Sequence, residues 1–169
     1  MSSRRTVAVA ILASVLAFTP PVHAQQAGGA TLTGQDYIEI QQLYARYTRM
    51  IDGGDAEGYA ALFTPDGSFN NNKGHDALVA FIKNRNGANL RHMNVNLVIL
   101  PTPEGASGSV YNFFLNVGER PPVITAASQY EDTLVKTPQG WRFKTRVNRT
   151  EGPPAAAAPQ PPPAAPPRQ

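Results

Sequence analysis

The segment YARYTRMIDGGDAEGYAALFTPDGSF, residues 44–69, holds the features that decide the fold. It begins inside an amphipathic helix, which Gly53-Gly54 should end because glycine enters left-handed backbone geometry without strain. A short second helix capped by Asp55 follows, and Pro65-Asp66-Gly67 predicts a turn into a strand. The segment therefore places an acid, Asp52, at the end of the first helix.

Upstream of this segment, the first helix is predicted to begin at Thr33. The Thr33 hydroxyl can cap free amides, and the acid Asp36 suits the first turn of a helix. One apolar and aromatic stripe then recurs at three- and four-residue steps, through Tyr37, Ile40, Tyr44, Tyr47 and Ile51. Downstream, a third helix is predicted over residues 75–84.

Beyond Gly87 the hydrophobic period changes from near 3.6 to 2, which predicts strands over residues 91–100, 109–117, 123–136 and 140–148. In the last strand, alternation predicts a core face of Trp141, Phe143 and Val147 and a solvated face of Arg142, Lys144, Arg146 and Asn148. Helices followed by an antiparallel sheet predict an α+β fold, with three N-terminal helices packed in a curved sheet.

The two ends of the chain differ from this domain. Residues 1–24 have two arginines, a short apolar run and Val22-His23-Ala24, which predicts a secretory signal cleaved after Ala24. We therefore expect a periplasmic or secreted protein with no membrane span after cleavage. Residues 25–32 are predicted to form a flexible lead, and the Pro/Ala-rich residues 152–169 predict a disordered tail. The domain itself spans 33–151.

Charge and composition narrow the classes of partner. Within residues 33–151, four Lys and eight Arg balance six Asp and six Glu, so the domain offers little electrostatic attraction to nucleic acid. The chain has no cysteine, and removal of the signal leaves two histidines, His75 and His92, too few for a convincing zinc site. We expect no metal and no cofactor.

Asp52 and His92 are the candidate catalytic pair. A carboxylate at a helix end can act as a base or orient one, and an imidazole titrates near neutral pH. Each residue also has a plain structural interpretation: Asp52 can simply bond the turn at Gly53-Gly54. His92 can simply face water, because His92, Asn94 and Asn96 alternate with a more apolar set of Met93, Val95, Leu97 and Ile99.

The order of elements resembles the SnoaL-like branch of the NTF2-like superfamily. The resemblance covers nearly all of residues 33–148 and rests on 44–69, on 74–78, on Leu90-Arg91-His92, on YEDTLV at 130–135 and on GWRFKTR at 140–146. It implies a cone, in which a curved sheet wraps around a long helix and leaves a pocket. Members use this pocket for polyketide cyclisation, scytalone dehydration, steroid isomerisation or ligand binding.

The same resemblance implies roles for particular residues. In members similar to scytalone dehydratase, an acid at the position of Asp52 orients a catalytic histidine. In members similar to polyketide cyclases, a late strand carries the base carboxylate, which would be Glu131 or Asp132. Two departures count against direct transfer of the dehydratase pattern: Ile51 replaces a tyrosine, and the second histidine falls near Asn116.

Several further side chains are predicted to bind substrate. Tyr44 and Tyr47 can donate hydroxyls to a substrate carbonyl, although aromatic stripes on a helix usually form core. The sheet adds Tyr111, Asn116, Gln129, Glu131 and Asp132. Because alternate residues of a strand share a face, Gln129 and Glu131 lie on one face and Tyr130 and Asp132 on the other. The pattern leaves open which pair points inward.

Three functions fit this sequence. The first is a cofactor-independent lyase, such as a dehydratase, or an isomerase or cyclase, which moves a proton on a small, mostly apolar carbonyl compound. The second is a non-catalytic domain that binds a small hydrophobic molecule. The third is an interaction module that uses a homodimer and the Pro/Ala-rich tail.

Overall fold

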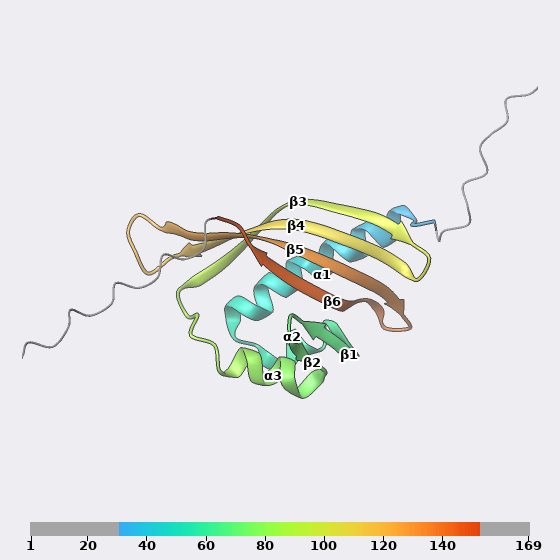
Figure 1. The fold of residues 1–169 in the computed structure, drawn as a ribbon, viewed down its shortest axis with the longest axis horizontal. Helices are drawn as coiled ribbons and strands as arrows, with labels where there is room; N and C mark the ends of the chain where they lie inside the picture. The colour runs from blue at the N-terminus through green and yellow to red at the C-terminus, as the bar shows by residue number, and fades with distance from the viewer. Residues whose placement is uncertain (1–30, 153–169) are drawn as a thin grey trace, which may run out of the picture.

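The computed structural model describes residues 31–152, in which a six-stranded sheet curves around one long helix (Figure 1). The predicted signal, nearly all of the predicted lead, and the predicted tail from residue 153 lie outside the described residues. Across 31–152, no helix is both long enough and apolar enough to cross a membrane. The predicted α+β class is confirmed.

Helix α1 (Gly34–Gly53) lies in the concave face of the sheet (Figure 1). Its start follows the prediction, because Thr33 and Asp36 exchange the two hydrogen bonds of a capping box. The Asp36 carboxylate also accepts bonds from Lys136 Nζ at 2.7 Å and Trp141 Nε1 at 3.0 Å. One acid thus caps the helix and joins its first turn to the sheet.

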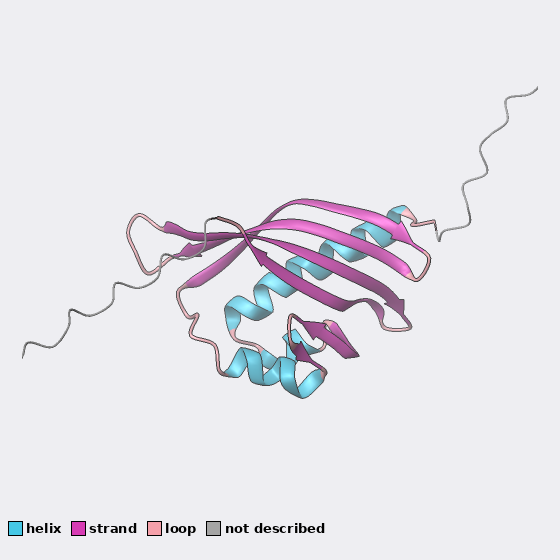
Figure 2. Cartoon of the chain, viewed as in Figure 1, coloured by secondary structure: helices cyan, strands magenta, loops and turns pink. Residues whose placement is uncertain are grey.

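The other end of α1 leads into two short helices and the two short strands that extend the sheet at one edge. Helix α2 (Ala56–Ala60), strand β1 (Phe63–Phe69), strand β2 (Asn72–Lys73) and helix α3 (His75–Lys83) follow in order. Gly54 ends α1 at a φ of 71°, as its position predicts. Together these elements close one end of the cone (Figure 2).

The main sheet is built from β3 (Leu90–Thr102), β4 (Gly105–Asn116), β5 (Val123–Thr137) and β6 (Gly140–Thr150). The strand order is β2-β1-β6-β5-β4-β3, and the pairs are antiparallel except β1 with β6. Strand β3 is therefore an edge strand.

A bulge in β3 corrects the predicted alternation of that strand. Val95 pairs with Tyr111 and Val98 with Ser109, so two residues of β3 oppose Val110 alone. Asn96, one of these two, takes a φ of 57°, a left-handed value that asparagine tolerates. His92 and Asn94 before the bulge therefore share the inner face with Leu97 and Ile99 after it, whereas the sequence pattern had placed these two pairs on opposite faces.

A second bulge, in β6, corrects the prediction for Arg146 and Val147. Thr145 pairs with Thr133 but Phe143 pairs with Leu134, which leaves Lys144 as the extra residue. The bulge reverses the alternation beyond it, so Arg146 is fully buried and Val147 is 38% exposed. The arginine predicted to face water is thus the largest fully buried side chain of the described domain.

Candidate active site

Asp52 and His92 lie in direct contact at the end of α1. His92 Nδ1 is 2.6 Å from Asp52 Oδ1, and the His92 backbone amide donates to Asp52 Oδ2 at 3.0 Å. Both oxygens of one carboxylate therefore hold one residue, which sets the position of its backbone and the direction of its ring. The structural interpretation in which His92 faces water is excluded, because its side chain is only 2% exposed.

This contact determines the tautomer of the imidazole. A carboxylate only accepts hydrogen bonds, so Nδ1 carries the proton and Nε2 carries the free lone pair. Within residues 31–152, Nε2 has no hydrogen-bond partner, and it is not among the polar atoms sealed from solvent. The unshared nitrogen is the one available to take a proton.

The surroundings of His92 favour its neutral form. Burial lowers the pKa of His92 from its ordinary value of 6.5, and the Asp52 carboxylate opposes part of that shift. The cations Arg85 and Arg146 lower the pKa further. The ring also packs edge-on against Phe114, with the centroids 4.9 Å apart. At neutral pH the imidazole is thus a positioned, uncharged base.

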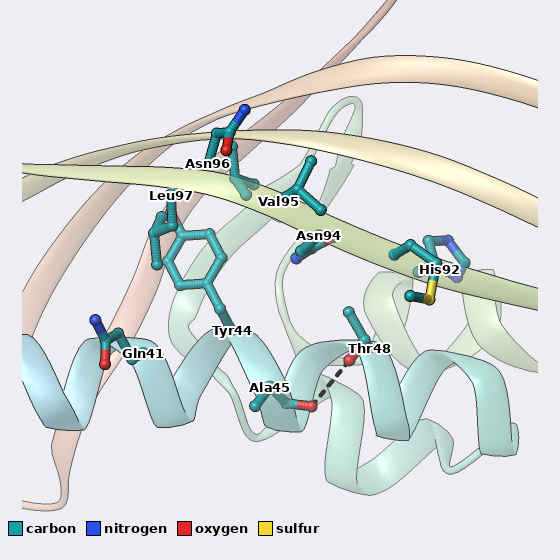
Figure 3. Close-up of a pocket in the computed structure, with 11 residues that line it drawn as sticks. Gln41, Tyr44, Ala45, Thr48, His92, Asn94, Val95, Asn96 and Leu97 are labelled. Carbon is teal, nitrogen blue, oxygen red and sulfur yellow. Dashed lines mark hydrogen bonds between the residues drawn. The ribbon is translucent and has the colours of Figure 1, made fainter.

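A cleft of about 460 Å³ lies between α1 and β3, and His92 forms part of its wall (Figure 3). Tyr44 and Gln41 project from α1 towards β3, and Asn94 points from β3 towards the helix (Figure 3). The lining is mixed in polarity and consists of Gln41, Tyr44, Ala45, Thr48, His92, Met93, Asn94, Val95, Asn96, Leu97 and Val110. Its size suits a small organic molecule.

Asp52 does not line this cleft but stands behind the imidazole. Its side chain is 13% exposed and lines a separate outer hollow with Thr48, Arg49 and Arg91. The arrangement is a row, with the carboxylate at the back, the imidazole in the middle and the cleft in front. In such a row the acid orients the histidine and offsets its charge after proton uptake.

Tyr44 belongs to a second, deeper group. Its hydroxyl donates to Asp132 Oδ2, and Asp132 receives two further bonds of 2.7 Å from Nε and Nη2 of Arg146. The side chains of Asp132 and Arg146 are both 0% exposed. Burial, followed by the charge of Asp132, raises the pKa of Tyr44, so the phenol stays protonated and donates.

The guanidinium of Arg146 is enclosed by aromatic rings. Its Cζ lies 4.0 Å from the ring centroids of Tyr47 and Phe143, 4.4 Å from that of Tyr130 and 4.7 Å from that of Tyr44. Burial alone would lower the pKa of Arg146, but the Asp132 carboxylate outweighs it and keeps the pKa well above its usual range. The group is a permanently charged core pair braced by cation–π contacts.

The structure answers the open question of parity on β5. Tyr130 and Asp132 point inward, at 1% and 5% exposure. Glu131 points outward, where its carboxylate accepts a bond of 2.7 Å from Arg149, and Gln129 bonds Ser109 on the same outer face. Neither Gln129 nor Glu131 reaches the cleft, so their prediction as pocket residues is wrong.

Three more predicted binding residues need correction. Tyr111 lies on the outer face, 43% exposed, because it follows the inward Val110 on β4. Asn116 lies at the end of β4, where it bonds Glu119 and Gly118 outside the cleft. Tyr47 is a buried core residue that contacts Arg146, as the alternative interpretation of the aromatic stripe predicted.

Other residues of the site were missed from the sequence. Arg146 looked like part of a solvated row, and only the unrecognised bulge brings it inside. Gln41 and Thr48 line the cleft at spacings of three and four from Tyr44 on the helix, which helical periodicity alone could have found. Asn112 is fully buried on β4, directly opposite Asn94 on β3.

Fold and site together define a class of protein, the α+β cones of the NTF2-like superfamily, here with a helix-borne acid behind a strand-borne histidine. A family model described as a SnoaL-like domain matches residues 33–147. The chain belongs to this SnoaL-like domain family, as its sequence resemblance indicated.

Individual relatives agree with this assignment. An uncharacterised protein of Mycobacterium tuberculosis is 31% identical over 122 residues, which are 66% of this chain and 83% of that protein. An NTF2-like protein with a cystatin-like fold from Novosphingobium aromaticivorans has a TM-score of 0.66 at 25% identity, covering 72% of this chain and 85% of that chain. A protein from Catenulispora acidiphila in complex with S-DNPA has a TM-score of 0.59 at 26% identity, and the match covers 70% of this chain and 95% of that chain.

Proposed function

We propose that this protein is a cofactor-independent lyase or isomerase that moves a proton on a small, mostly apolar carbonyl compound. The observation that carries the proposal is the contact between Asp52 and His92, with the free Nε2 of a buried, neutral imidazole at the cleft. A general base needs a lone pair open to the substrate and must be unprotonated at the working pH; the free Nε2 at the cleft and the lowered pKa of His92 support both conditions.

The first chemical step follows from this arrangement. Nε2 of His92 takes a proton from the carbon next to the carbonyl, and the electron pair of that C–H bond moves towards the carbonyl oxygen to form an enolate. The imidazolium that results keeps its Nδ1 bond to Asp52, whose negative charge stabilises it. Asp52 is therefore a positioning residue, and His92 is the catalytic base.

The hydroxyl donors expected from the aromatic stripe are not available for this step. The hydroxyl of Tyr44 is committed to Asp132, and the hydroxyl of Tyr47 lies in the core, 3.5 Å from that of Tyr59. Tyr44 instead contributes part of the cleft wall. The proposal therefore assigns proton transfer to Asp52 and His92 alone.

Exchange of ketone hydrogens tests the proposal without knowledge of the natural substrate. The protein is incubated in deuterium oxide with cyclohexanone and benzylacetone, and loss of the α-hydrogen signal is followed by proton NMR. We expect exchange above the buffer rate, and a fall of about 100-fold or more in His92→Gln, since a general base contributes at least about that factor. The matched control is His75→Gln, which changes the other histidine of the domain, at an exposed site.

The alternative is a domain that binds a small hydrophobic molecule without changing it. The Catenulispora structure supports a ligand-holding role for this fold, because that protein holds S-DNPA. Exchange no faster than buffer for every ketone, or equal exchange by wild type and His92→Gln, would contradict proton transfer and leave the binding function.

We also propose that the domain acts outside the cytoplasm, in the periplasm or the medium, after removal of residues 1–24. The amino-terminal sequence of the exported protein tests this directly. It should begin at Gln25, and an amino terminus at Met1 would oppose it.

A further inference from the structure

Two asparagines face each other on the inner side of the sheet. Asn94 on β3 and Asn112 on β4 are direct cross-strand partners, and both point into the cone. Directly opposed side chains start about 5 Å apart, so one small group can contact both. Asn94 belongs to the wall of the cleft and points at α1 (Figure 3).

These amides are short of hydrogen-bond partners. Nδ2 and Oδ1 of Asn94 and Oδ1 of Asn112 are all sealed from solvent, so a ligand group reaches them only by displacing a neighbouring side chain of the cleft wall, and none has a partner among residues 31–152. The remaining group, Nδ2 of Asn112, donates only a long bond of 3.5 Å to Ser128. An unpartnered buried amide destabilises a fold, so two of them side by side on a cleft wall are typical of a place where a ligand completes the bonding.

The chemistry of the free groups selects the ligand. As assigned, they offer two carbonyl acceptors and one amino donor. Turning Asn112 over would leave its amino group free and place its carbonyl near the Ser128 hydroxyl, so either assignment offers at least one free acceptor and one free donor. A hydroxyl can donate to one carbonyl and accept from the amino group. A ketone oxygen or an ionised carboxylate or phosphate only accepts, so each would leave at least one of these carbonyls unpartnered, and the cleft lining has no Lys or Arg to hold an anion.

Position relates this group to the base. Asn94 is two residues from His92 on the same face of β3, which corresponds to roughly 7 Å along a strand. We propose that Asn94 and Asn112 form a hydroxyl-binding subsite, which selects ketones whose hydroxyl lies some 7 Å from the carbon presented to His92. The placement of the ketone beside His92 rests on the proposed function, whereas the binding of the hydroxyl by the asparagines does not.

A pair of ketones that differ by one hydroxyl tests the subsite by binding alone. Benzylacetone and 4-hydroxybenzylacetone are titrated into the protein by calorimetry. Wild type should bind the hydroxylated ketone about tenfold more tightly, the worth of one well-placed hydrogen bond. Asn94→Leu and Asn94→Ala should each bring the two affinities to within about twofold, by weakening only the hydroxylated ketone.

Two further variants separate this proposal from the catalytic one. His92→Gln should lose α-hydrogen exchange yet keep the tenfold preference, because the preference belongs to the asparagines. Asn116→Leu makes the same chemical change on β4 outside the cleft and should alter neither property. Equal binding of the two ketones by wild type, binding of neither, or a preference that survives both folded Asn94 variants would overturn the subsite.

Discussion

Burial, opposed by two hydrogen bonds that His92 donates to Asp52, decides how the imidazole titrates. The carboxylate alone would favour the charged ring, but burial disfavours it more strongly, and the pKa of His92 falls below its ordinary value of 6.5. A base with a lowered pKa remains unprotonated at neutral pH. His92 is thus held in place by an acid without being held in its charged form.

This balance predicts the pH dependence of both activity and stability. Proton exchange should rise with pH and level off at or below about 6.5, where His92 is deprotonated. Because the unfolded chain binds this proton more readily than the folded one, the stability tied to neutral His92 is present above pH 6.5 and is lost as pH falls towards the lowered pKa.

Titration of the imidazole signals by NMR checks this prediction, with His75→Gln used to assign them. Asp52→Asn removes the charge that raises the pKa of His92, so the pKa should fall further in that variant. A purely structural Asp52 would change stability without moving the titration. A His92 pKa above 6.5 in wild type would refute the prediction.

Because Asp132 and Arg146 form a buried ion pair, we expect the replacement of one carboxylate oxygen by an amide group to lower the stability strongly. Asp132→Asn leaves a cation that is 0% exposed without its counter-charge, which costs about 3–5 kcal/mol of unfolding free energy. Glu131→Gln makes the same change one residue away, in an exposed pair with Arg149, and should cost about 1 kcal/mol at most. Urea denaturation of both variants tests the contrast, and equal losses would contradict it.

At the scale of elements, periodicity predicted which segments are helices and strands, but not where a strand changes face. The predicted third helix and all four long strands appear, with shifted ends. A bulge adds one residue to a strand without any distinctive residue type, so Asn96 and Lys144 looked like ordinary members of an alternation. Asp52 was predictable because it directly precedes the helix end at Gly53-Gly54. His92 was predictable because it lies at the start of the strand that follows Gly87.

The approach of α1 to the sheet depends on a residue without a side chain. Gly108 on β4 lies opposite Asp132 on β5, and the hydroxyl of Tyr44 occupies the space above it. A methyl group on Gly108 would meet that hydroxyl at a separation that real Cβ atoms essentially never show. Tyr44 passes over this gap to reach Asp132.

Gly108→Ala should therefore displace Tyr44 from Asp132 and destabilise the domain by about 1–3 kcal/mol, the usual cost of overpacking. Thermal unfolding measures the loss. Gly53→Ala is the matched control, because nothing beyond the adjoining residues and the helix's own backbone lies within 4 Å of the added methyl, and it should change stability by about 0.5–1 kcal/mol at most. A Gly108→Ala variant as stable as wild type would show that the hydroxyl is not required there.

At the scale of the whole molecule, one core joins the helix to the sheet. Ile40, Leu43, Tyr47, Leu134 and Phe143 are all fully buried in it, and they come from both ends of the domain. Asp36 adds a polar tie between the first turn of α1 and the hairpin of β5 and β6. These contacts lie entirely within residues 31–152, so we infer that this part folds by itself.

A truncated chain of residues 31–152 tests the domain boundaries. Its melting temperature should match that of residues 25–169 to within about 2 °C, because a difference of 1 kcal/mol would already move it by several degrees. A truncated chain that melts more than about 5 °C lower would show that the ends take part in the folded domain.

The bulge at Asn96 also gives one strand two independent halves. Every residue that follows it is rotated by half a turn, so the front of β3 offers imidazole and amide groups while the rear offers aliphatic ones to the same helix. Substitutions before the bulge can therefore change the polar groups that line the cleft without altering the aliphatic contacts that the residues after the bulge make with α1. One inserted residue thus allows the polar half and the aliphatic half of this edge strand to vary separately.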